Sequence, residues 1–345
     1  MDLPLIWSLL IATAVMLYVL LDGADLGIGI LTAVSRSDDE RNLMTATIEP
    51  VWDGNETWLI LGGGGLFAAF PLAYAVLMPA FYIPVLIMLA ALIFRGVAFE
   101  FRHKAVRKTT RLFWNGAFAY GSLTAALAQG FILGGFIQGV EVEGRAFAGG
   151  ALDWLTPFTI LTAISVAGGY VLLGSSWLIL KTEGELQTYS RLWARRALIF
   201  IVLAMAIVSL ATLSIDPRVT ERWGVSMSAI DFGKFLPLAP IPIFAAVLIY
   251  LNWRDIVLRP DTSPDWRPMI WSALIFLTGY LGLAVSLFPL LVPFDLTIWE
   301  TAARDNALML MFVGAAIMLP VILGYTIYVY SLFWGKVDPD EAYHD

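Results

Sequence analysis

Residues 5–33 of the chain read LIWSLLIATAVMLYVLLDGADLGIGILTA. A helix needs ~20 mostly apolar residues to cross a bilayer, and this stretch exceeds that length. It starts close to Met1 without a basic leader and continues past the length of a signal-peptide core. We therefore expect a first membrane helix whose last turns carry Asp22 and Asp25.

The composition extends this expectation to the whole chain. Of the 345 residues, 59% are hydrophobic and 14% are charged, and the mean hydropathy is +0.78. Soluble domains are ~45–50% apolar and ~25% charged. The net charge of −7 argues against nucleic acid as a partner, because nucleic acid needs a basic face. The composition thus indicates an all-α polytopic membrane protein.

Nine segments are long and apolar enough to cross a bilayer, and we expect residues 1–345 to form one integral membrane domain. The seventh is the shortest, and Pro237, Pro240 and Pro242 crowd its start, where a first helical turn tolerates proline. The nine segments are residues 5–33, 55–72, 76–100, 113–138, 155–180, 195–214, 236–252, 269–291 and 306–334.

Lys and Arg are unevenly distributed between alternate connections. With the N-terminus outside, 15 of the 21 fall in inner connections and 5 in outer ones, while Arg95 lies within a segment. Inner connections of membrane proteins carry the excess of Lys and Arg. We therefore expect N-out, C-in topology with an odd number of crossings, which requires the seventh segment to cross.

Two pairs of acids occur at the ends of apolar segments, where ionisable groups are costly and commonly functional. Asp22 and Asp25 are three residues apart and share a helix face. Asp53 and Glu56 have the same spacing in the stretch WDGNETW, residues 52–58, which opens the second segment. Simpler interpretations stay open, since the first pair can mark the water boundary and the second can cap a helix.

The topology places further polar groups on the same side of the bilayer. Arg95 and Glu100 lie at the inner end of the third segment, and Arg95 can neutralise one carboxylate of the group. Carboxylates that lead inward from the cytoplasm are what a proton-uptake path needs.

Four consecutive glycines, Gly62–Gly65, lie within the second segment. Each Gly destabilises a helix by roughly 1 kcal/mol relative to Ala. We expect close packing against a helix or a cofactor to offset that cost.

Metal ligands are scarce in this chain. It has no Cys and two His, His103 in a basic connection and His344 beside the C-terminus. Haem iron inside a membrane is most often bound by His. If the protein takes part in redox chemistry, we expect a partner to hold the metal, and we expect no metal site here.

An ordered set of motifs along nearly the whole chain resembles the subunit II family of cytochrome bd-type quinol oxidases. The sequence departs from the family in its short length, a trimmed outer loop after the sixth segment, and Ala24, where members often have Phe. The set does not separate the cyanide-insensitive branch from the others. The motifs are Asp22-Gly23-x-Asp25-Leu26-Gly27, Trp52-Asp53-Gly54-Asn55-Glu56-x-Trp58, the Gly-rich run into Leu66-Phe67-Ala68-Ala69-Phe70-Pro71, Phe94-Arg95-x-Val97-x-Phe99-Glu100, Thr182-Glu183-Gly184-Glu185, Phe288-Pro289, Leu296-Thr297-Ile298-Trp299-Glu300 and Leu319-Pro320-Val321-Ile322-Leu323.

The resemblance implies a complex of the bacterial inner membrane that oxidises quinol and reduces O₂ to water in aerobic respiration. It implies nine helices, as two four-helix bundles and a peripheral helix, paired pseudo-symmetrically with a subunit I that holds two b haems and haem d. Asp53 would line a proton channel and Trp58 would border an O₂ route. The resemblance also leaves room for a structural quinone in this chain and for a small single-helix accessory subunit.

The expected proton path consists of Asp53, Glu56, Asp22, Asp25 and Glu100, with Arg95 as charge partner. Two other functions compete with it. A secondary transporter would also have broken helices and intramembrane acids. A haem-free scaffold subunit would tolerate neutralisation of every acid.

Overall fold

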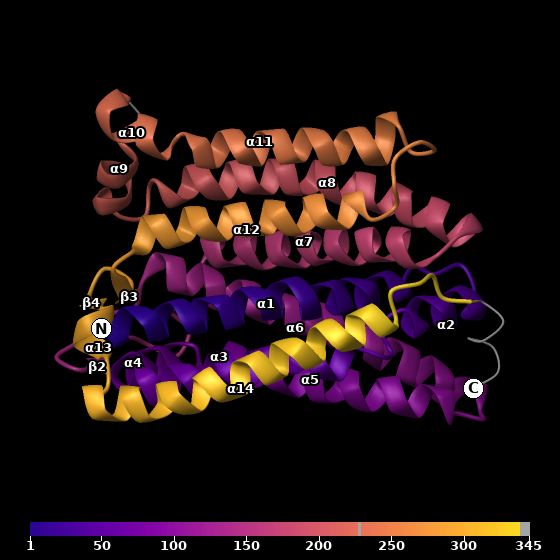
Figure 1. The fold of residues 1–345 in the computed structure, drawn as a ribbon, viewed down its shortest axis with the longest axis horizontal. Helices are drawn as coiled ribbons and strands as arrows, with labels where there is room; N and C mark the ends of the chain where they lie inside the picture. The colour runs from indigo at the N-terminus through magenta and orange to yellow at the C-terminus, as the bar shows by residue number, and fades with distance from the viewer. Residues whose placement is uncertain (227–228, 339–345) are drawn as a thin grey trace.

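The computed structural model of the chain describes residues 1–226 and 229–338, so His344 lies outside the described residues. Long helices run side by side along the longest axis of the molecule (Figure 1). These helices are α1 (Leu3–Thr32), α3 (Trp52–Ala69), α5 (Tyr82–His103), α6 (Lys108–Gln138), α7 (Pro157–Lys181), α8 (Gly184–Thr212), α11 (Pro240–Trp253), α12 (Arg267–Leu287) and α14 (Asp305–Leu332).

Short elements occupy the two ends of the long helices. The strands form two antiparallel hairpins, β1 with β2 and β3 with β4. The short helices are α2 (Asp38–Ala46), α4 (Pro71–Ala80), α9 (Pro217–Trp223), α10 (Phe232–Leu238), α13 (Ile298–Thr301) and the π-helical η1 (Arg254–Leu258), and the strands are β1 (Val142–Glu143), β2 (Ala146–Phe147), β3 (Leu290–Val292) and β4 (Leu296–Thr297).

Within residues 1–226 and 229–338, eight helices are long and apolar enough to cross a membrane. They are α1, α5, α6, α7, α8, α12, α14 and the continuous stretch of α11 with η1, Pro240–Leu258. The shortest expected crossing, the seventh, is therefore long enough once η1 extends it. The remaining crossing, toward the outer end, is made by α3, whose first turns are polar, followed by α4 (Figure 1).

Prolines divide the region where two single segments, 55–72 and 76–100, were expected. Phe70 has φ −130° and ψ 61°, outside the helical region, because the residue before a proline is disfavoured there. Phe81 separates α4 from α5 with φ −110° and ψ 22°. Pro84 follows in the first turn of α5 and has no N–H for the carbonyl four residues back. The second crossing is thus built from two helices, α3 and α4.

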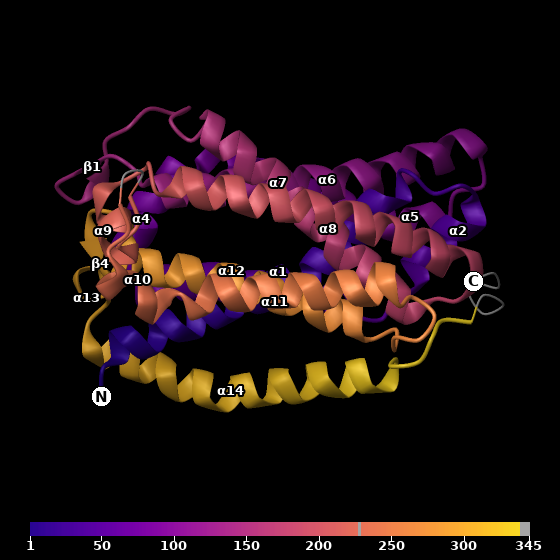
Figure 2. The same cartoon turned by 90° about the horizontal axis from the view of Figure 1, so that it is seen from above.

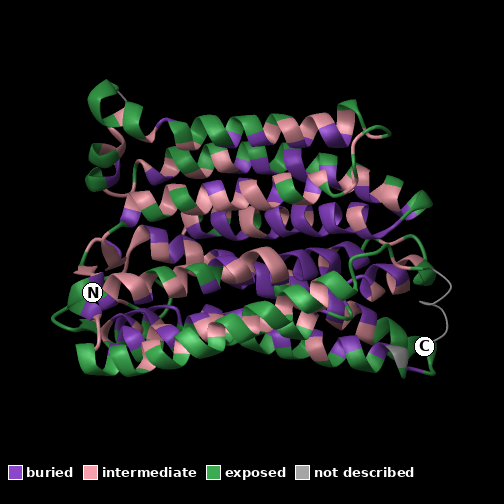
Figure 3. Cartoon of the chain, viewed as in Figure 1, coloured by how far each residue is buried: buried purple, intermediate pink, exposed green. Residues whose placement is uncertain are grey.

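Eight of the long helices form two groups of four, and the remaining one, α14, lies at the edge. Helices α1, α3, α5 and α6 pack in one group and α7, α8, α11 and α12 in the other, and α7 joins them by contacting both α1 and α6. Helix α14 lies along the outside (Figure 2). In the part of the chain that the structure describes, Leu308 is its only buried residue, and its surface is mostly exposed (Figure 3). The peripheral helix of the expected fold class is therefore α14.

Helices α1 and α7 cross at glycines. A Cβ added to Gly27 would lie 1.8 Å from the carbonyl oxygen of Tyr170, and one added to Gly174 would lie 2.5 Å from the backbone nitrogen of Ile28. Small residues let membrane helices approach at backbone distance. This contact fixes α1, which carries Asp22 and Asp25, against the second group of helices.

The two ends of the molecule differ in charge. The end where α1 terminates also holds α2, the connection from α7 to α8 and the connection from η1 to α12 (Figure 1). These connections carry the Lys and Arg excess, whereas the opposite end holds the N-terminus, α9, α10 and α13 (Figure 1). By the positive-inside rule the first end is cytoplasmic.

Candidate functional site

A single guanidinium lies at the centre of a buried acidic cluster. Arg95 of α5 is 0% exposed. Its Nη1 donates to Asp22 Oδ1 at 2.8 Å and to Glu56 Oε1 at 2.7 Å. Its Nη2 lies 3.9 Å from Asp25 Oδ2. Three carboxylates from α1 and α3 therefore share one cation.

The cluster is well inside the helices. Asp22 is ten residues before the end of α1, which corresponds to ~15 Å of helix. Asp22 and Asp25 are 0% and 2% exposed. They therefore do not mark the water boundary, as the simpler interpretation of the sequence allowed.

Glu56 does not cap α3. The N-cap residue is Val51, and no side-chain cap hydrogen bond forms there among the described residues. The Glu56 side chain instead reaches Arg95 and keeps 27% of its surface exposed. Trp52, in the first turn of α3, places its ring 5.8 Å from the Arg95 guanidinium carbon. The start of α3 is thus organised around Arg95.

Hydrogen bonds extend the cluster to the peripheral helix. Asn55 Nδ2 donates to Asp25 Oδ2 at 2.8 Å, and the Tyr330 hydroxyl of α14 donates to Asn55 Oδ1 at 3.0 Å. Asn55 is 1% exposed. A buried amide that satisfies both a carboxylate and a hydroxyl fixes α3 and α14 relative to α1.

A second chain of polar side chains continues toward the outer end. Tyr18 lies one turn before Asp22 on the same face of α1. Gln129 of α6 donates to the Tyr18 hydroxyl at 2.7 Å, and Tyr170 of α7 donates to Gln129 Oε1 at 2.5 Å. Hydrogen-bonding side chains therefore extend from the acids toward the outer end and join α1, α6 and α7.

The expected site residues divide into two sets. Asp22, Asp25, Glu56 and Arg95 come together, whereas Asp53 lies on the exposed side of α3. Glu100 lies on the exposed side of α5, away from Arg95.

Trp58, the candidate for the O₂ route, is 3% exposed and packs with Ala14 and Tyr18. In residues 1–226 and 229–338 its Nε1 has no hydrogen-bond acceptor.

Several members of the network have no predicted role from the sequence. Asn55 lies in the WDGNETW stretch, and the others are Tyr18, Gln129, Tyr170 and Tyr330. Gln129 had a recognisable signal, because an amide in the middle of an apolar helix needs a partner. A tyrosine in such a helix has no comparable signal, since tyrosines also occur at membrane surfaces.

The Gly62–Gly65 run is packed on one side only. Added Cβ atoms would lie 3.1 Å from Val15 at Gly62 and 3.0 Å from Ile11 at Gly65. At Gly63 and Gly64 nothing in the described part of the chain lies within 4 Å. The expected close packing thus holds for the face toward α1, while the opposite face of α3 is open.

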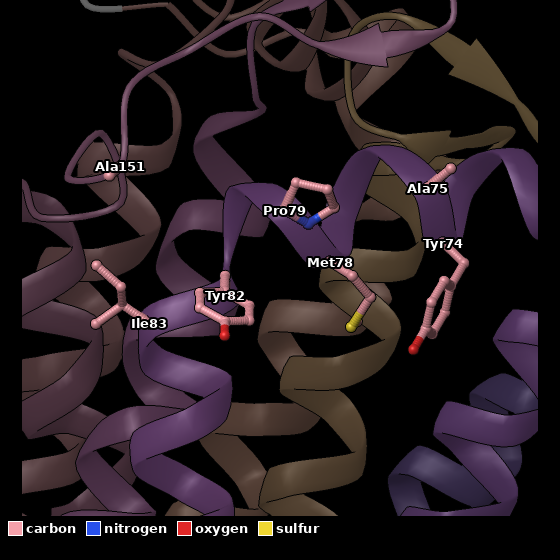
Figure 4. A pocket seen from close by; sticks show the side chains of 7 residues that line it. All are labelled: Tyr74, Ala75, Met78, Pro79, Tyr82, Ile83 and Ala151. Carbon is pink, nitrogen blue, oxygen red and sulfur yellow. The ribbon is translucent and has the colours of Figure 1, made fainter.

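An apolar pocket of about 630 Å³ lies near the outer end, between α4 and α5 (Figure 4). Tyr74, Met78, Tyr82 and Ile83 point into it, and Ala151 borders it (Figure 4). Its lining contains no Lys, Arg, Asp or Glu among the described residues, so it is not part of the acidic network.

Membrane-length helices around a buried charged cluster define a polytopic membrane protein. Residues 3–333 match the family described as cytochrome bd terminal oxidase subunit II. Because the match spans nearly the whole chain, the chain belongs to that family and is a multi-pass protein of the bacterial inner membrane.

Individual relatives agree with this assignment. The chain is 28% identical over 370 residues to cytochrome bd-I ubiquinol oxidase subunit 2 of Escherichia coli, covering 98% of this chain and 96% of that protein. It is 29% identical over 346 residues to cytochrome bd ubiquinol oxidase subunit 2 of Bacillus subtilis, covering 97% of each. The solved bd oxidase of Geobacillus thermodenitrificans matches with a TM-score of 0.72 and 16% identity over 96% of this chain and 99% of the other, which shows a shared fold.

Proposed function

We propose that this chain is the haem-free second subunit of a quinol oxidase complex and supplies its cytoplasmic proton-uptake path. Reduction of one O₂ to two waters consumes four electrons, which quinol supplies, and four protons. Protons taken from the cytoplasm, with electrons from quinol on the outer side, separate charge across the membrane without a pump.

The haems belong, in this proposal, to subunit I. His is the common haem ligand at membrane depth. The two histidines are His103, which ends α5, and His344, which lies outside the described residues. Because the chain offers so few His, we assign both b haems and haem d to a pseudo-symmetric partner.

The observation that supports the path most is the acidic cluster around Arg95. Buried polar atoms normally have hydrogen-bond partners. Within the described residues, Asp22 Oδ2 and Arg95 Nε and Nη2 have none. Bound water would satisfy these atoms, and water between carboxylates can relay protons. Glu56, which is partly exposed, is the natural member to exchange protons with the surface.

Asp53 and Glu100 enter the proposal through their exposure. Both are exposed at the cytoplasmic half of the helices, where a carboxylate facing lipid would be costly. The open glycines Gly63 and Gly64 lie on the same helix as Asp53. We infer that subunit I covers Asp53 and Glu100 and that these two acids begin the path at the interface.

Trp58 is assigned to the O₂ route because it is buried beside α1 in an apolar cluster. A structural quinone and a small accessory subunit stay predictions from the resemblance.

The test uses the purified complex with its partner subunit. Asp53→Asn and Glu56→Gln should each lower quinol-dependent O₂ consumption, by up to about 10²-fold, the lower end for a positioned proton-transfer group. Haem absorption bands should stay unchanged. Asp39→Asn, on the exposed surface of α2, is the matched control. Unchanged turnover in both variants would favour the scaffold, and a colourless preparation without a partner would favour a transporter.

A further inference from the structure

The polar side chains beyond the acids donate their hydrogen bonds in one direction. Tyr170 of α7 donates its hydroxyl hydrogen to Gln129 Oε1 at 2.5 Å, and Gln129 Nε2 donates to the Tyr18 oxygen at 2.7 Å. An amide nitrogen of this kind only donates hydrogen bonds and accepts none. The hydroxyl hydrogen of Tyr18 is therefore not used by Gln129 and is free for another acceptor. The proposed proton path does not include these three residues.

Asp22 supplies the acceptor that the Tyr18 hydrogen lacks. The two residues lie four apart on one face of α1, and the Tyr18 hydroxyl interacts with the Asp22 carboxylate. Asp22 Oδ1 accepts from Arg95, whereas the buried Oδ2 has no hydrogen-bond partner among the described residues. A charged acceptor without a donor is costly when buried, so a hydrogen bond from Tyr18 to Oδ2 satisfies both groups.

The orientation of the Gln129 amide follows from the position of Tyr170. The Tyr170 side chain is 1% exposed, and a Cβ added to Gly23 would lie 2.6 Å from its Cε1. The ring thus occupies the space that a larger residue beside Asp22 would fill. With the amide reversed, Gln129 Oε1 would draw the Tyr18 hydrogen away from Asp22. Hydrogen bonds to a charged group are stronger than neutral ones, which favours the observed orientation.

We propose that Gln129 is a positioning residue of the proton-uptake path, because its amide directs the Tyr18 hydroxyl at Asp22 and so keeps Asp22 ionised. This inference rests on the proposed function and deepens it. A hydrogen bond donated to a carboxylate favours its charged form. Asp22 then stays the anion that balances Arg95, and protons in transit bind to the other carboxylates of the cluster.

The charge on Asp22 matters to the whole cluster. If Asp22 took up a proton, Arg95 would be left to pair with Glu56 alone at short range, which hinders protonation of Glu56. The titratable and charged groups that interact with Asp22 come from α1, α3, α5, α7 and α14, and they are Tyr18, Asp25, Glu56, Arg95, Tyr170 and Tyr330.

The test is the pH profile of quinol-dependent O₂ consumption by the purified complex. Tyr18→Phe removes the hydroxyl and keeps the ring, and Gln129→Met removes the amide and keeps the length of the side chain. In both variants the ionised form of Asp22 loses its donor, so the acid limb of the profile should move to higher pH by about one unit. One unit is a tenfold change in an ionisation equilibrium. The loss of turnover relative to wild type should shrink as the pH rises.

The matched control is Tyr280→Phe. The Tyr280 hydroxyl donates to the Ala12 carbonyl of α1 at 2.9 Å and so contacts the same helix away from the acids. This variant should keep the wild-type pH profile. An unshifted acid limb in Tyr18→Phe and Gln129→Met would overturn the positioning role, as would a loss of turnover that is equal at every pH. Tyr18→Phe removes one oxygen, so it decides the matter even if Gln129→Met does not assemble.

Glu56→Gln in the same assay separates this inference from the proposed function. If Glu56→Gln lowers turnover while Tyr18→Phe keeps the wild-type profile, the positioning role alone is wrong. If Asp53→Asn and Glu56→Gln both leave turnover unchanged, the proton path itself is wrong and the positioning role falls with it. Lower turnover in Glu56→Gln together with a shifted acid limb in Tyr18→Phe supports both.

Discussion

Replacing Arg95 with Gln removes the cation shared by the buried carboxylates of Asp22 and Asp25 and the partly exposed carboxylate of Glu56. The magnitude follows from the geometry. Asp22 is fully buried and 2.8 Å from Arg95 Nη1, so the substitution leaves an uncompensated charge. Breaking a buried pair in this way costs about 3–5 kcal/mol. Glu56 adds less, because its side chain is 27% exposed and can be hydrated.

The assay is denaturant unfolding of the detergent-solubilised complex, compared at equal protein concentration. Arg95→Gln should lower the unfolding free energy by about 3–5 kcal/mol. Arg95→Gln combined with Asp22→Asn should recover much of the loss, since the stranded charge is gone. Arg145→Gln, on the exposed β1–β2 hairpin, should stay within about 0.5 kcal/mol of wild type. If Arg95→Gln also stays within that margin, the carboxylates are neutral without Arg95 and the charge argument is refuted.

Three further predictions concern packing, the O₂ route and pH. Gly27→Ala should destabilise the α1–α7 contact by about 1–3 kcal/mol in a thermal unfolding assay, whereas Gly64→Ala, with open space at its Cβ position, should leave the isolated fold unharmed. Trp58→Ala should cost about 3–5 kcal/mol because it opens a cavity, and Trp58→Phe, with a fold near normal, should raise the O₂ concentration needed for half-maximal turnover. Hydrogen bonds from Arg218 hold the pKa of Asp216, the N-cap of α9, below its usual range. That contribution is present above the unfolded pKa of about 4 and lost as pH falls through the folded value. Limited proteolysis at α9 should therefore increase only in acid, and the increase should vanish in Asp216→Asn.

The helices and their orientation could be read from the sequence, because the bilayer imposes local rules. A crossing needs a run of apolar residues, and the Lys and Arg of each connection are counted without knowledge of packing. The break at Phe70 is also specified locally, by Pro71, although the expected segment 55–72 runs through both residues.

Membership of the acidic site depended on which helix faces meet. Asp53 and Glu56 have helical i, i+3 spacing, yet Glu56 turns inward to Arg95 and Asp53 outward. Positions three apart differ by about 60° around a helix, so the boundary between core and surface can fall between them. Spacing could not place that boundary, because it depends on where the Arg95 side chain of α5 reaches α1 and α3.

The sequence alone therefore determined a polytopic membrane protein with acids toward its cytoplasmic side, since those properties are sums over short stretches. Only the tertiary structure decided that Asp22, Asp25 and Glu56 share Arg95, and that Tyr18, Gln129 and Tyr170 continue the network. Those contacts join residues far apart in the chain. They exist only once separate helices pack together, as at the Gly27–Gly174 crossing, where α1 and α7 approach at backbone distance.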